Sequence, residues 1–349
     1  MAYTTINKPS DYFSTTIYTG TATQQSVNTG IDMANNGSML WVKDRDGANN
    51  HNLFDTFMGI DYLIFPSAND GKFASTRLVS FDSTGYTALS TAGVNQNGNR
   101  HVAWNWLAGS SQAGSSNTDG SITSTVSANT TSGFSMVSYT GTGANATVGH
   151  GLGSAPKMML IKHLNTINHW RVYHSSLGAT NVIYLSTNDA TDTGQGSVNF
   201  NNTAPTSSVF SLGTNAGVNA SGGTYVAYCF AEKKGFSKFG SYTGNGNADG
   251  TFVYTGFKPA LVLVKETSAI DNWILLDNKR DTAPNPHKLA LFPNEADAEA
   301  GDYLTDFLSN GFKIRSATGS LNTSSATYIY ITFAEQTLVG TNNIPATAR

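Results

Sequence analysis

Charged side chains are scarce in this sequence of 349 residues. Asp, Glu, Lys and Arg together make up 12% of it, about half the share of roughly 25% that is usual in globular proteins. The formal net charge is −3, so the sequence offers no strongly basic face of the kind that binds nucleic acid. The surface must instead be covered by Ser, Thr, Asn, Gln and Gly, which are solvated without charge.

Cysteine is nearly absent, and long apolar runs are absent. Cys229 is the single cysteine, so no internal disulfide can form, and its place in an apolar strand pattern predicts a buried, unreactive thiol. No run of about 18 apolar residues is present, which argues against a membrane-spanning helix. The N-terminus shows no basic segment followed by an apolar one, which argues against a signal peptide. We therefore expect a protein that is made and folded in a cytoplasm.

The apolar residues that are present fall into three similar pairs of runs. Each pair begins with an apolar run that ends in a lysine, and a second run with aromatic or aliphatic residues follows it. This pattern indicates two neighbouring buried strands. The pairs are 39–43 with 52–55, 157–162 with 169–173, and 260–265 with 271–277.

The three pairs belong to a longer repeat that spans about 90 residues from its opening tyrosine to its closing aromatic residue. Each copy opens on a Tyr-Thr-Gly motif and closes on an aromatic-rich strand pattern. Short strand patterns about ten residues apart, separated by Gly, Asn and Ser, are typical of antiparallel sandwiches. The sequence therefore predicts an all-β protein of three tandem antiparallel β-sandwich, jelly-roll-like repeat units. The opening motifs are at 17–20, 138–141 and 241–244, and the closing strands are at 101–106, 225–230 and 328–333.

The stretch between the first two units has two interpretations. It is rich in Ser, Gly and Thr, as linkers are, but Ile122 and Val126 stand at even spacing, as in an edge hairpin. A helical pattern occurs at 295–300 and is too short to change the fold class. The predicted organisation is an arm (1–13), unit 1 (14–108), a linker or edge hairpin (109–133), unit 2 (134–234), unit 3 (235–336) and a tail (337–349). We expect Val42, Ile161 and Val264 to occupy equivalent buried positions in the three units.

No residue pattern supports catalysis, and we predict no catalytic, cofactor-binding or metal-ligating residue. Residues 44–50 are rich in Asp and Asn, as calcium loops are, but they lack the bidentate glutamate, and turns favour the same residues. Asp271 and Asp277 lie near the ends of one strand, where turn chemistry explains them better than a pair of glycosidase acids does. His169 and His174 point to opposite faces of a strand, which argues against a shared metal ion.

Two further patterns are typical of binding sites, and each has a simpler interpretation. The sequence GHGLG at 149–153 precedes a strand, whereas a dinucleotide fingerprint must precede a helix. Tryptophans and tyrosines can stack on sugars. However, Trp41, Trp104 and Trp273 lie within apolar runs, which favours core packing.

Several short motifs extend over nearly the whole chain and are least evident in the first unit. They are SYTGTG at 138–143, VGHGLGSAPK at 148–157, YHSSLG at 173–178, GTYVAYCFAE at 223–232, GFSKFG at 235–240 and NIPATAR at 343–349. In these motifs the sequence is similar to a family of virion proteins from tailed bacteriophages, abundant in marine phages of cyanobacteria and other oceanic bacteria. The resemblance implies a β-rich structural component of the particle, and it supplies no catalytic residues.

Within that context two roles compete. The first is a tail appendage of the fibre type, which touches the host surface and binds a surface glycan there. The second is a decoration protein that stabilises the head, and the absence of a shaft, heptads or collagen-like repeats brings it close to the first. A glycan-degrading enzyme is an outsider. Both main roles imply a virion protein assembled in the bacterial cytoplasm, with other virion proteins as partners and a homo-oligomeric state, and without cofactor, nucleic acid or membrane insertion.

The two ends of the chain are the predicted assembly contacts. Each carries apolar residues in a polar context, and we expect each unit to be complete without them. At least one end should therefore pack on a neighbouring subunit or partner. The residues are Tyr3, Ile6, Tyr12 and Phe13 in the arm, and Leu338, Ile344 and Pro345 in the tail.

Overall fold

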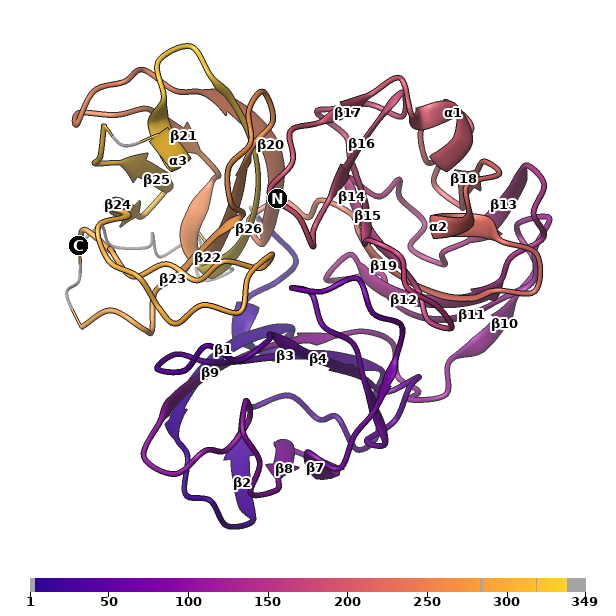
Figure 1. Ribbon diagram of the computed structural model, residues 1–349, viewed down its shortest axis with the longest axis horizontal. Coiled ribbons are helices and arrows are strands. Elements are labelled where there is room, and N and C mark those ends of the chain that lie inside the picture. The colour runs from indigo at the N-terminus through magenta and orange to yellow at the C-terminus, as the bar shows by residue number, and fades with distance from the viewer. Residues whose placement is uncertain (1–3, 283–284, 318, 338–349) are drawn as a thin grey trace.

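The computed structural model describes residues 4–282, 285–317 and 319–337, and it shows an all-β protein of several antiparallel sheets (Figure 1). None of the described helices is long and apolar enough to cross a membrane. The elements are η1 (Pro9–Asp11), β1 (Phe13–Thr19), β2 (Gln25–Asn28), β3 (Ser38–Asp44), β4 (Asn52–Asp55), β5 (Tyr62–Leu63), β6 (Phe73–Ala74), β7 (Leu78–Asp82), β8 (Gly85–Ala88), β9 (Arg100–Leu107), β10 (Ser115–Asn117), β11 (Ser124–Asn129), β12 (Phe134–Thr140), β13 (Ala146–Gly149), β14 (Met158–His163), β15 (Arg171–His174), β16 (Asn181–Tyr184), β17 (Asp192–Thr193), α1 (Gly196–Asn199), β18 (Val209–Leu212), α2 (Ala216–Asn219), β19 (Thr224–Phe230), β20 (Ser237–Thr243), β21 (Phe252–Tyr254), β22 (Phe257–Glu266), β23 (Ile274–Asp277), β24 (Thr305–Leu308), β25 (Gly311–Ile314), α3 (Gly319–Asn322) and β26 (Thr327–Thr337).

One strand order occurs in three sheets. The orders are β1-β9-β3-β4, β12-β19-β14-β15 and β20-β26-β22-β23, and the second sheet is extended by β10 and β11 on one side and by β16 and β17 on the other. We refer to β1–β9, β10–β19 and β20–β26 as units 1, 2 and 3. In Figure 1 they form three lobes, coloured indigo to purple, magenta to pink, and orange to yellow.

The register is the same in the three sheets. The residues predicted to be equivalent lie in the strand next to the closing strand, and each is fully buried. Across the ladder to the following strand, the pairs are Val42 with Asn52, Ile161 with Arg171, and Val264 with Ile274. The predicted equivalence of these three positions is therefore confirmed.

A smaller sheet covers one face of each large sheet. These sheets are β2-β8-β7, β13-β18 and β21-β25-β24. Because side chains alternate along a strand, every second residue of a central strand faces this smaller sheet. Val42 packs in a core with Val27, and Ile161 packs in another with Val148. Val264 lies in a third core.

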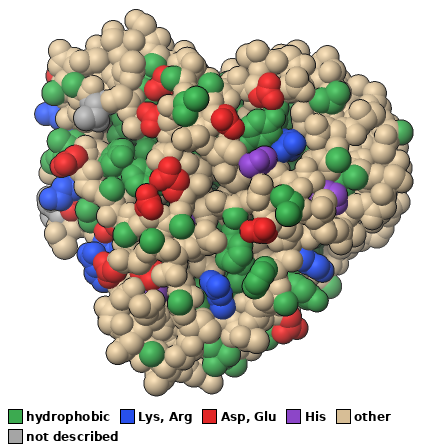
Figure 2. Space-filling view, viewed as in Figure 1, with side chains coloured by type: hydrophobic (Ala, Val, Ile, Leu, Met, Phe, Trp, Pro, Cys, Tyr) green, Lys and Arg blue, Asp and Glu red, His purple; other side chains and the backbone are tan. Residues whose placement is uncertain are grey.

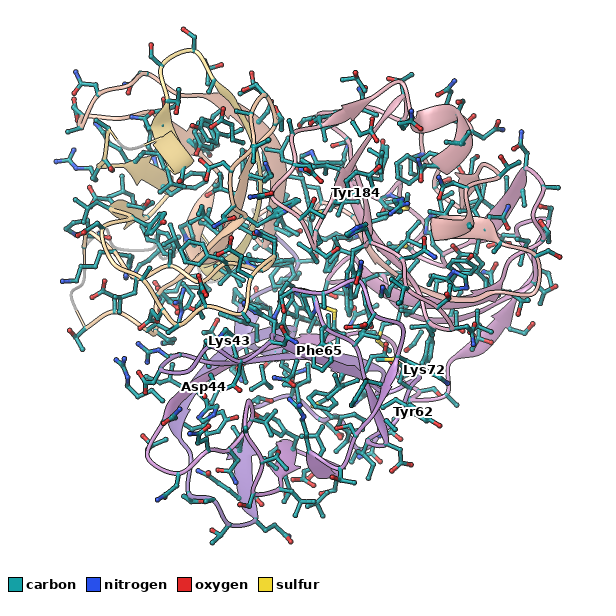
Figure 3. All side chains as sticks on the ribbon, in the orientation of Figure 1. Lys43, Asp44, Tyr62, Phe65, Lys72 and Tyr184 are labelled. Carbon is teal, nitrogen blue, oxygen red and sulfur yellow. The ribbon has the colours of Figure 1, made fainter. Side chains whose placement is uncertain are left out.

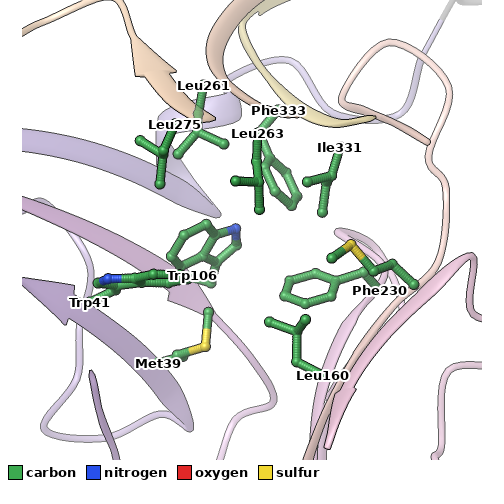
Figure 4. A pocket seen from close by; sticks show the side chains of 11 residues that line it. Met39, Trp41, Trp106, Leu160, Phe230, Leu261, Leu263, Leu275, Ile331 and Phe333 are labelled. Carbon is green, nitrogen blue, oxygen red and sulfur yellow. The ribbon is translucent and has the colours of Figure 1, made fainter. Parts of the chain in front are cut away.

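The other faces of the three large sheets meet in one shared core (Figure 4). At its centre one aromatic ring from each closing strand contacts the other two. The ring centroids of Trp106 and Phe230 lie 6.4 Å apart, those of Trp106 and Phe333 5.7 Å, and those of Phe230 and Phe333 5.9 Å. A cavity of about 20 Å³ remains beside them, lined only by apolar side chains such as Met39, Leu160 and Leu263. The burial of apolar area between the lobes holds them in one body.

A second set of contacts joins each unit to the next at the last residue of β4, β15 and β23. Asp55 accepts a hydrogen bond from the Tyr228 hydroxyl, and Asp277 accepts one from the Trp104 indole at 3.1 Å. The Nε2 atom of His174 lies 3.2 Å from the Tyr330 carbonyl. The same strand position thus makes a different kind of hydrogen bond at each of the three boundaries.

Two features of the secondary structure differ from the sequence interpretation or decide between its alternatives. Residues 115–117 and 124–129 are strands that extend the large sheet of unit 2, so the hairpin interpretation of 109–133 holds there. Residues 295–300 contain no helix, and that prediction was wrong. Their backbone joins its neighbours instead, as in the bridge between Ala290 and Ala300.

The N-terminal arm is also placed differently from the prediction. Ile6 and Phe13 are buried in the shared core, where the Phe13 ring lies 5.1 Å from that of Phe333, and Tyr12 lies 6.0 Å from Phe236. The premise that the arm cannot bury its apolar residues within the chain is wrong, because it assumed separate cores. Tyr3, Leu338, Ile344 and Pro345 lie outside the described residues.

Candidate binding face

Three equivalent loops lie at one end of the large sheets, and a buried lysine precedes each. The loops are 44–50, 163–169 and 266–272, and the lysines are Lys43, Lys162 and Lys265. Each ammonium group donates to backbone carbonyl oxygens. Lys43 bonds to Asp44 at 2.6 Å and Gly47 at 3.0 Å.

The equivalent lysines behave in the same way. Lys265 bonds to the carbonyl of Glu266 at 2.5 Å, and Lys162 bonds to Asn168 and, across the boundary with unit 1, to Asn69 at 2.9 Å. Burial lowers the pKa of Lys43 and Lys265 to about 8 and that of Lys162 to about 7, because the charged form loses solvation. Within the described part of the chain none of the three forms an ion pair with a carboxylate. Their role is to hold the loop backbones in place.

Each loop also contacts the neighbouring unit. The amide of Asn168 donates to Asn69 at 2.8 Å, that of Asp271 donates to Asn188 at 2.9 Å, and the Arg45 carbonyl accepts from Glu299 at 2.8 Å. The loops of units 2 and 3 expose isoleucines at equivalent positions: Ile167 is 67% and Ile270 is 71% exposed. The rigid loops therefore present apolar tips to solvent.

The residue after each loop lies at a boundary, close to an aromatic residue of a neighbouring unit. The Trp170 indole donates to the Phe65 carbonyl at 2.9 Å, and the Trp273 indole donates to the Tyr184 carbonyl at 2.8 Å. His51 takes this place in unit 1, and its buried Nε2 atom has no hydrogen-bond partner among the described residues. The two indole bonds join units 2 and 3 to the backbone beside an aromatic residue of the neighbouring unit.

Cations stack on two of these aromatic rings. The Arg77 guanidinium lies 5.7 Å from the Phe65 ring centre, and that of Arg171 lies 4.7 Å from the Tyr184 ring centre. Such contacts are attractive because the ring face is electron-rich. Figure 3 labels Phe65 on the purple lobe and Tyr184 on the pink lobe.

Unit 1 carries a hairpin with aromatic residues close to Phe65. Strands β5 and β6 pair Leu63 with Phe73. Tyr62 and Phe73 are 36% and 55% exposed, the Phe73 ring lies 5.9 Å from that of Phe65, and the Lys72 ammonium lies 4.3 Å from the centre of the Tyr62 ring. Figure 3 labels Phe65, Tyr62 and Lys72 on unit 1. Figure 2, in the same orientation, shows hydrophobic side chains (green) gathered in this part of the surface, with basic side chains (blue) at their edges. We call Tyr62, Phe65, Lys72, Phe73 and Arg77 the aromatic cluster.

The acidic residues considered as ligands or acids are engaged elsewhere. The Asp44 carboxylate accepts from the amides of Asp46 and Gly47 and from the side chains of Asn49 and Asn99, so it closes a turn. Asp46 forms an ion pair with Arg100. No group of three or more His, Cys, Asp or Glu residues that could hold a metal ion occurs in the described ranges.

The pair of acids in unit 3 is likewise structural. Asp277 is fully buried and bonds to Arg280 at 2.6 Å, while Asp271 accepts from its neighbour Asn272 at 2.7 Å and from Ser320 at 3.0 Å. Burial alone would raise the pKa of Asp277, but the Arg280 guanidinium and two backbone amides lower it below its usual value. A carboxyl group held ionised in this way is a poor general acid.

Histidines and core residues complete the outcome of the sequence search. His169 bonds to Ser186, whereas His174 lies at the boundary with unit 3, so the two are not brought together. Cys229 is buried, as predicted, and burial raises the pKa of its thiol. Trp41, Trp104 and Trp273 are buried, which confirms core packing.

The aromatic cluster itself was missed by sequence reasoning. Its residues lie in a loop-rich stretch between strand patterns, where no periodicity separates exposed from buried aromatics. The available signal was the closely spaced Tyr62, Phe65 and Phe73 with the basic residues Lys72 and Arg77. That signal identifies a surface cluster only once the hairpin is known.

Comparisons with known proteins identify the family of the chain but assign it no function. A family model described as "Domain of unknown function (DUF7483)" matches residues 8–337, and the chain therefore belongs to this family. A comparison with curated proteins found no match.

Proposed function

We propose that this chain is a non-enzymatic structural component of a tailed-phage virion, a tail appendage that contacts the host surface through its aromatic cluster. The observation that carries the proposal is the exposure of Tyr62 and Phe73 beside Lys72 on a rigid frame. Aromatic side chains that are exposed to solvent forgo the stability of burial, and exposed apolar patches of this kind mark binding sites. The motif resemblance to phage virion proteins supplies the context.

We also propose that the three units are copies of one jelly-roll-like sandwich unit arranged about an approximate three-fold axis. The shared strand order and register support this, as does the ring of contacts in which each unit reaches the next from the same position. A single chain of this kind has the shape of a trimer but can differ at each boundary. It can therefore confine a binding cluster to one lobe.

A head decoration protein is the second candidate. The three lobes make a compact body without a shaft (Figure 1), and such a body suits a lattice of other virion proteins or of further copies of this chain. Counting copies per virion by quantitative mass spectrometry separates the roles. Tens of copies at most fit a tail appendage, and hundreds fit a head lattice.

Binding to cells of the host tests the role of the aromatic cluster. The double variant Tyr62→Ala with Phe73→Ala should lose binding while keeping its melting curve. Phe252→Ala with Tyr254→Ala is a matched control, because these aromatics are 43% and 54% exposed on unit 3 and lie outside the cluster. Equal binding by both double variants would contradict the proposal, and release of soluble oligosaccharides from the cell surface would instead support the glycan-degrading enzyme.

A further inference from the structure

A hollow of about 400 Å³ lies beside the aromatic cluster, at the boundary between units 1 and 3. It is lined by Asn49, Asn50, Phe65, Arg77 and Ala296, among others. Its walls therefore come from a loop held by a buried lysine, from the aromatic position beside the boundary and from a segment of unit 3. A hollow with one cation, one aromatic wall and two amides is a polar site with an apolar side.

Among the described arginines, Arg77 is the one whose guanidinium has neither a carboxylate partner nor more than one hydrogen bond. Six arginines lie in the described residues, and Arg45, Arg100, Arg280 and Arg315 each form an ion pair with a carboxylate. Arg171 forms none, but its guanidinium is engaged by Asn199, Asn215 and the His169 carbonyl.

The guanidinium of Arg77, in contrast, makes a single hydrogen bond with a described residue, from Nη1 to Asn52. A guanidinium has five N–H donors, so most of those of Arg77 remain available. Burial lowers the pKa of Arg77, which shows that its charge is partly stripped of water without compensation from a carboxylate. Partial burial of a charge without an opposite charge nearby lowers stability, and it is unusual in a chain so poor in charge.

We propose that this hollow binds the carboxylate of an acidic sugar, with Arg77 as the anchoring residue. A guanidinium matches a carboxylate in a planar, two-bonded geometry. The side-chain NH2 of Asn50 and the side-chain oxygen of Asn49 make no hydrogen bond with described residues and are available to sugar hydroxyls. Phe65, which Arg77 overlies, is buried, but the ring of Phe73, 5.9 Å away, is 55% exposed and offers a flat apolar surface on which a sugar ring stacks.

The shape of the cluster favours an acidic oligosaccharide over a free anion. Arg77 lies over the Phe65 ring, and that ring lies 5.9 Å from the exposed Phe73 ring, so a sugar whose carboxylate binds Arg77 can be followed by a second sugar that meets an aromatic face. Asp61 and Asp70 belong to the same hairpin segment, so the region is not uniformly positive. The attraction is therefore local to the two cations, and binding should depend on the position of the carboxylate as well as on charge.

The inference rests on the proposed function and names the ligand class of that site. It is tested with the full chain, by calorimetry against a glucuronic-acid oligosaccharide, its carboxyl-reduced neutral counterpart and inorganic phosphate. The acidic oligosaccharide should bind, and the neutral one and phosphate should bind at least about tenfold more weakly. Arg77→Gln should cause a similar loss for the acidic sugar and little change for the neutral one, whereas Arg77→Lys should retain part of the binding.

Arg315→Gln is the control, because Arg315 is a partly exposed arginine on unit 3. Should Arg77→Gln fail to fold by its melting curve, Asn50→Ala serves instead and should weaken the same ligand. Equal affinity for acidic and neutral sugars, or binding that ignores both substitutions, would overturn the inference. Host-cell binding that persists in Arg77→Gln but disappears in Tyr62→Ala with Phe73→Ala would overturn it too, while leaving the proposed function intact.

Discussion

The boundary between units 3 and 1 and the boundary between units 1 and 2 each carry an aspartate at the same structural position. The electrostatic surroundings of the two aspartates are opposite. At the first, Asp277 bonds to Trp104 of unit 1 and to Arg280, which bonds in turn to Glu299 at 2.7 Å. Glu299 also pairs with Arg45 of unit 1. These ionised groups are 0–5% exposed, so the boundary is a buried ionic network.

At the second boundary the equivalent Asp55 has no cationic partner among the described residues. Its carboxyl accepts from the Tyr228 hydroxyl and the Met58 amide, and burial raises its pKa above the usual value. The comparison teaches that units with the same fold need not share interface chemistry. Apolar burial in the shared core supplies the common attraction, and each boundary then satisfies its polar groups separately.

The largest expected effect comes from breaking the ionic network. Arg280→Met leaves Asp277 buried without its cation and Glu299 with Arg45 as its remaining cation, and it should lower the free energy of unfolding by about 3–5 kcal/mol. Urea denaturation measures this. The matched change is Asp55→Asn, whose amide can keep contacts with both Met58 and Tyr228, so its cost should be at most about 1 kcal/mol. Similar costs for the two variants would remove the distinction between the boundaries.

Removing the arm from the same boundary should have nearly as large an effect. Phe13 belongs to unit 1 and packs against Phe333 of unit 3 and Trp106, at 5.1 and 4.9 Å. Phe13→Ala should therefore cost about 3 kcal/mol through lost burial and the cavity left behind. Deleting residues 1–13 should lower the melting temperature of the isolated protein. An unchanged melting curve would mean that the arm does not pack in the shared core.

These expectations show which parts of the structure the sequence determines. Val42, Ile161 and Val264 were predicted because a short uninterrupted apolar run rich in β-branched residues is typical of a buried strand, and that information is local. The burial of Phe13 was not predicted, because it depends on how three sheets meet, and no pattern within one repeat encodes that arrangement. The hollow was missed for a related reason: the fold of unit 1 brings Asn49 and Arg77 together, and Ala296 joins them only through the docking of unit 3 on unit 1.

The two boundaries should also respond to pH with opposite signs. The pKa of Asp277 is lowered relative to an unfolded value of about 3.9, so its stabilising contribution is present above that value and is lost as pH falls through the folded pKa. The pKa of Asp55 is raised, so its contribution is complete below about 3.9 and is lost as pH rises through the folded pKa.

Denaturation of the wild type and of Asp55→Asn across pH 3–7 checks this. Relative to the wild type, Asp55→Asn should gain stability as pH rises over that range, because the substitution removes a carboxyl that is costly to ionise. Asp277→Asn should lose stability over the same range. Parallel pH profiles of the two variants would show that the two carboxyl groups do not differ as described.

The smallest effect on stability should come from the loop tips, and it compares the boundary of units 1 and 2 with that of units 2 and 3. Ile167 and Ile270 occupy equivalent positions and are 67% and 71% exposed, so Ile167→Ser and Ile270→Ser should each change the free energy of unfolding by less than about 0.5 kcal/mol. Binding should separate them. The loop of Ile167 is joined to the aromatic hairpin by the bonds from Asn168 to Asn69 and from Lys72 to Leu164, whereas the loop of Ile270 contacts Asn188 of unit 2. Ile167→Ser should therefore weaken attachment to host cells severalfold while Ile270→Ser leaves it unchanged, and an equal effect of the two substitutions would show that attachment is not centred on the aromatic cluster.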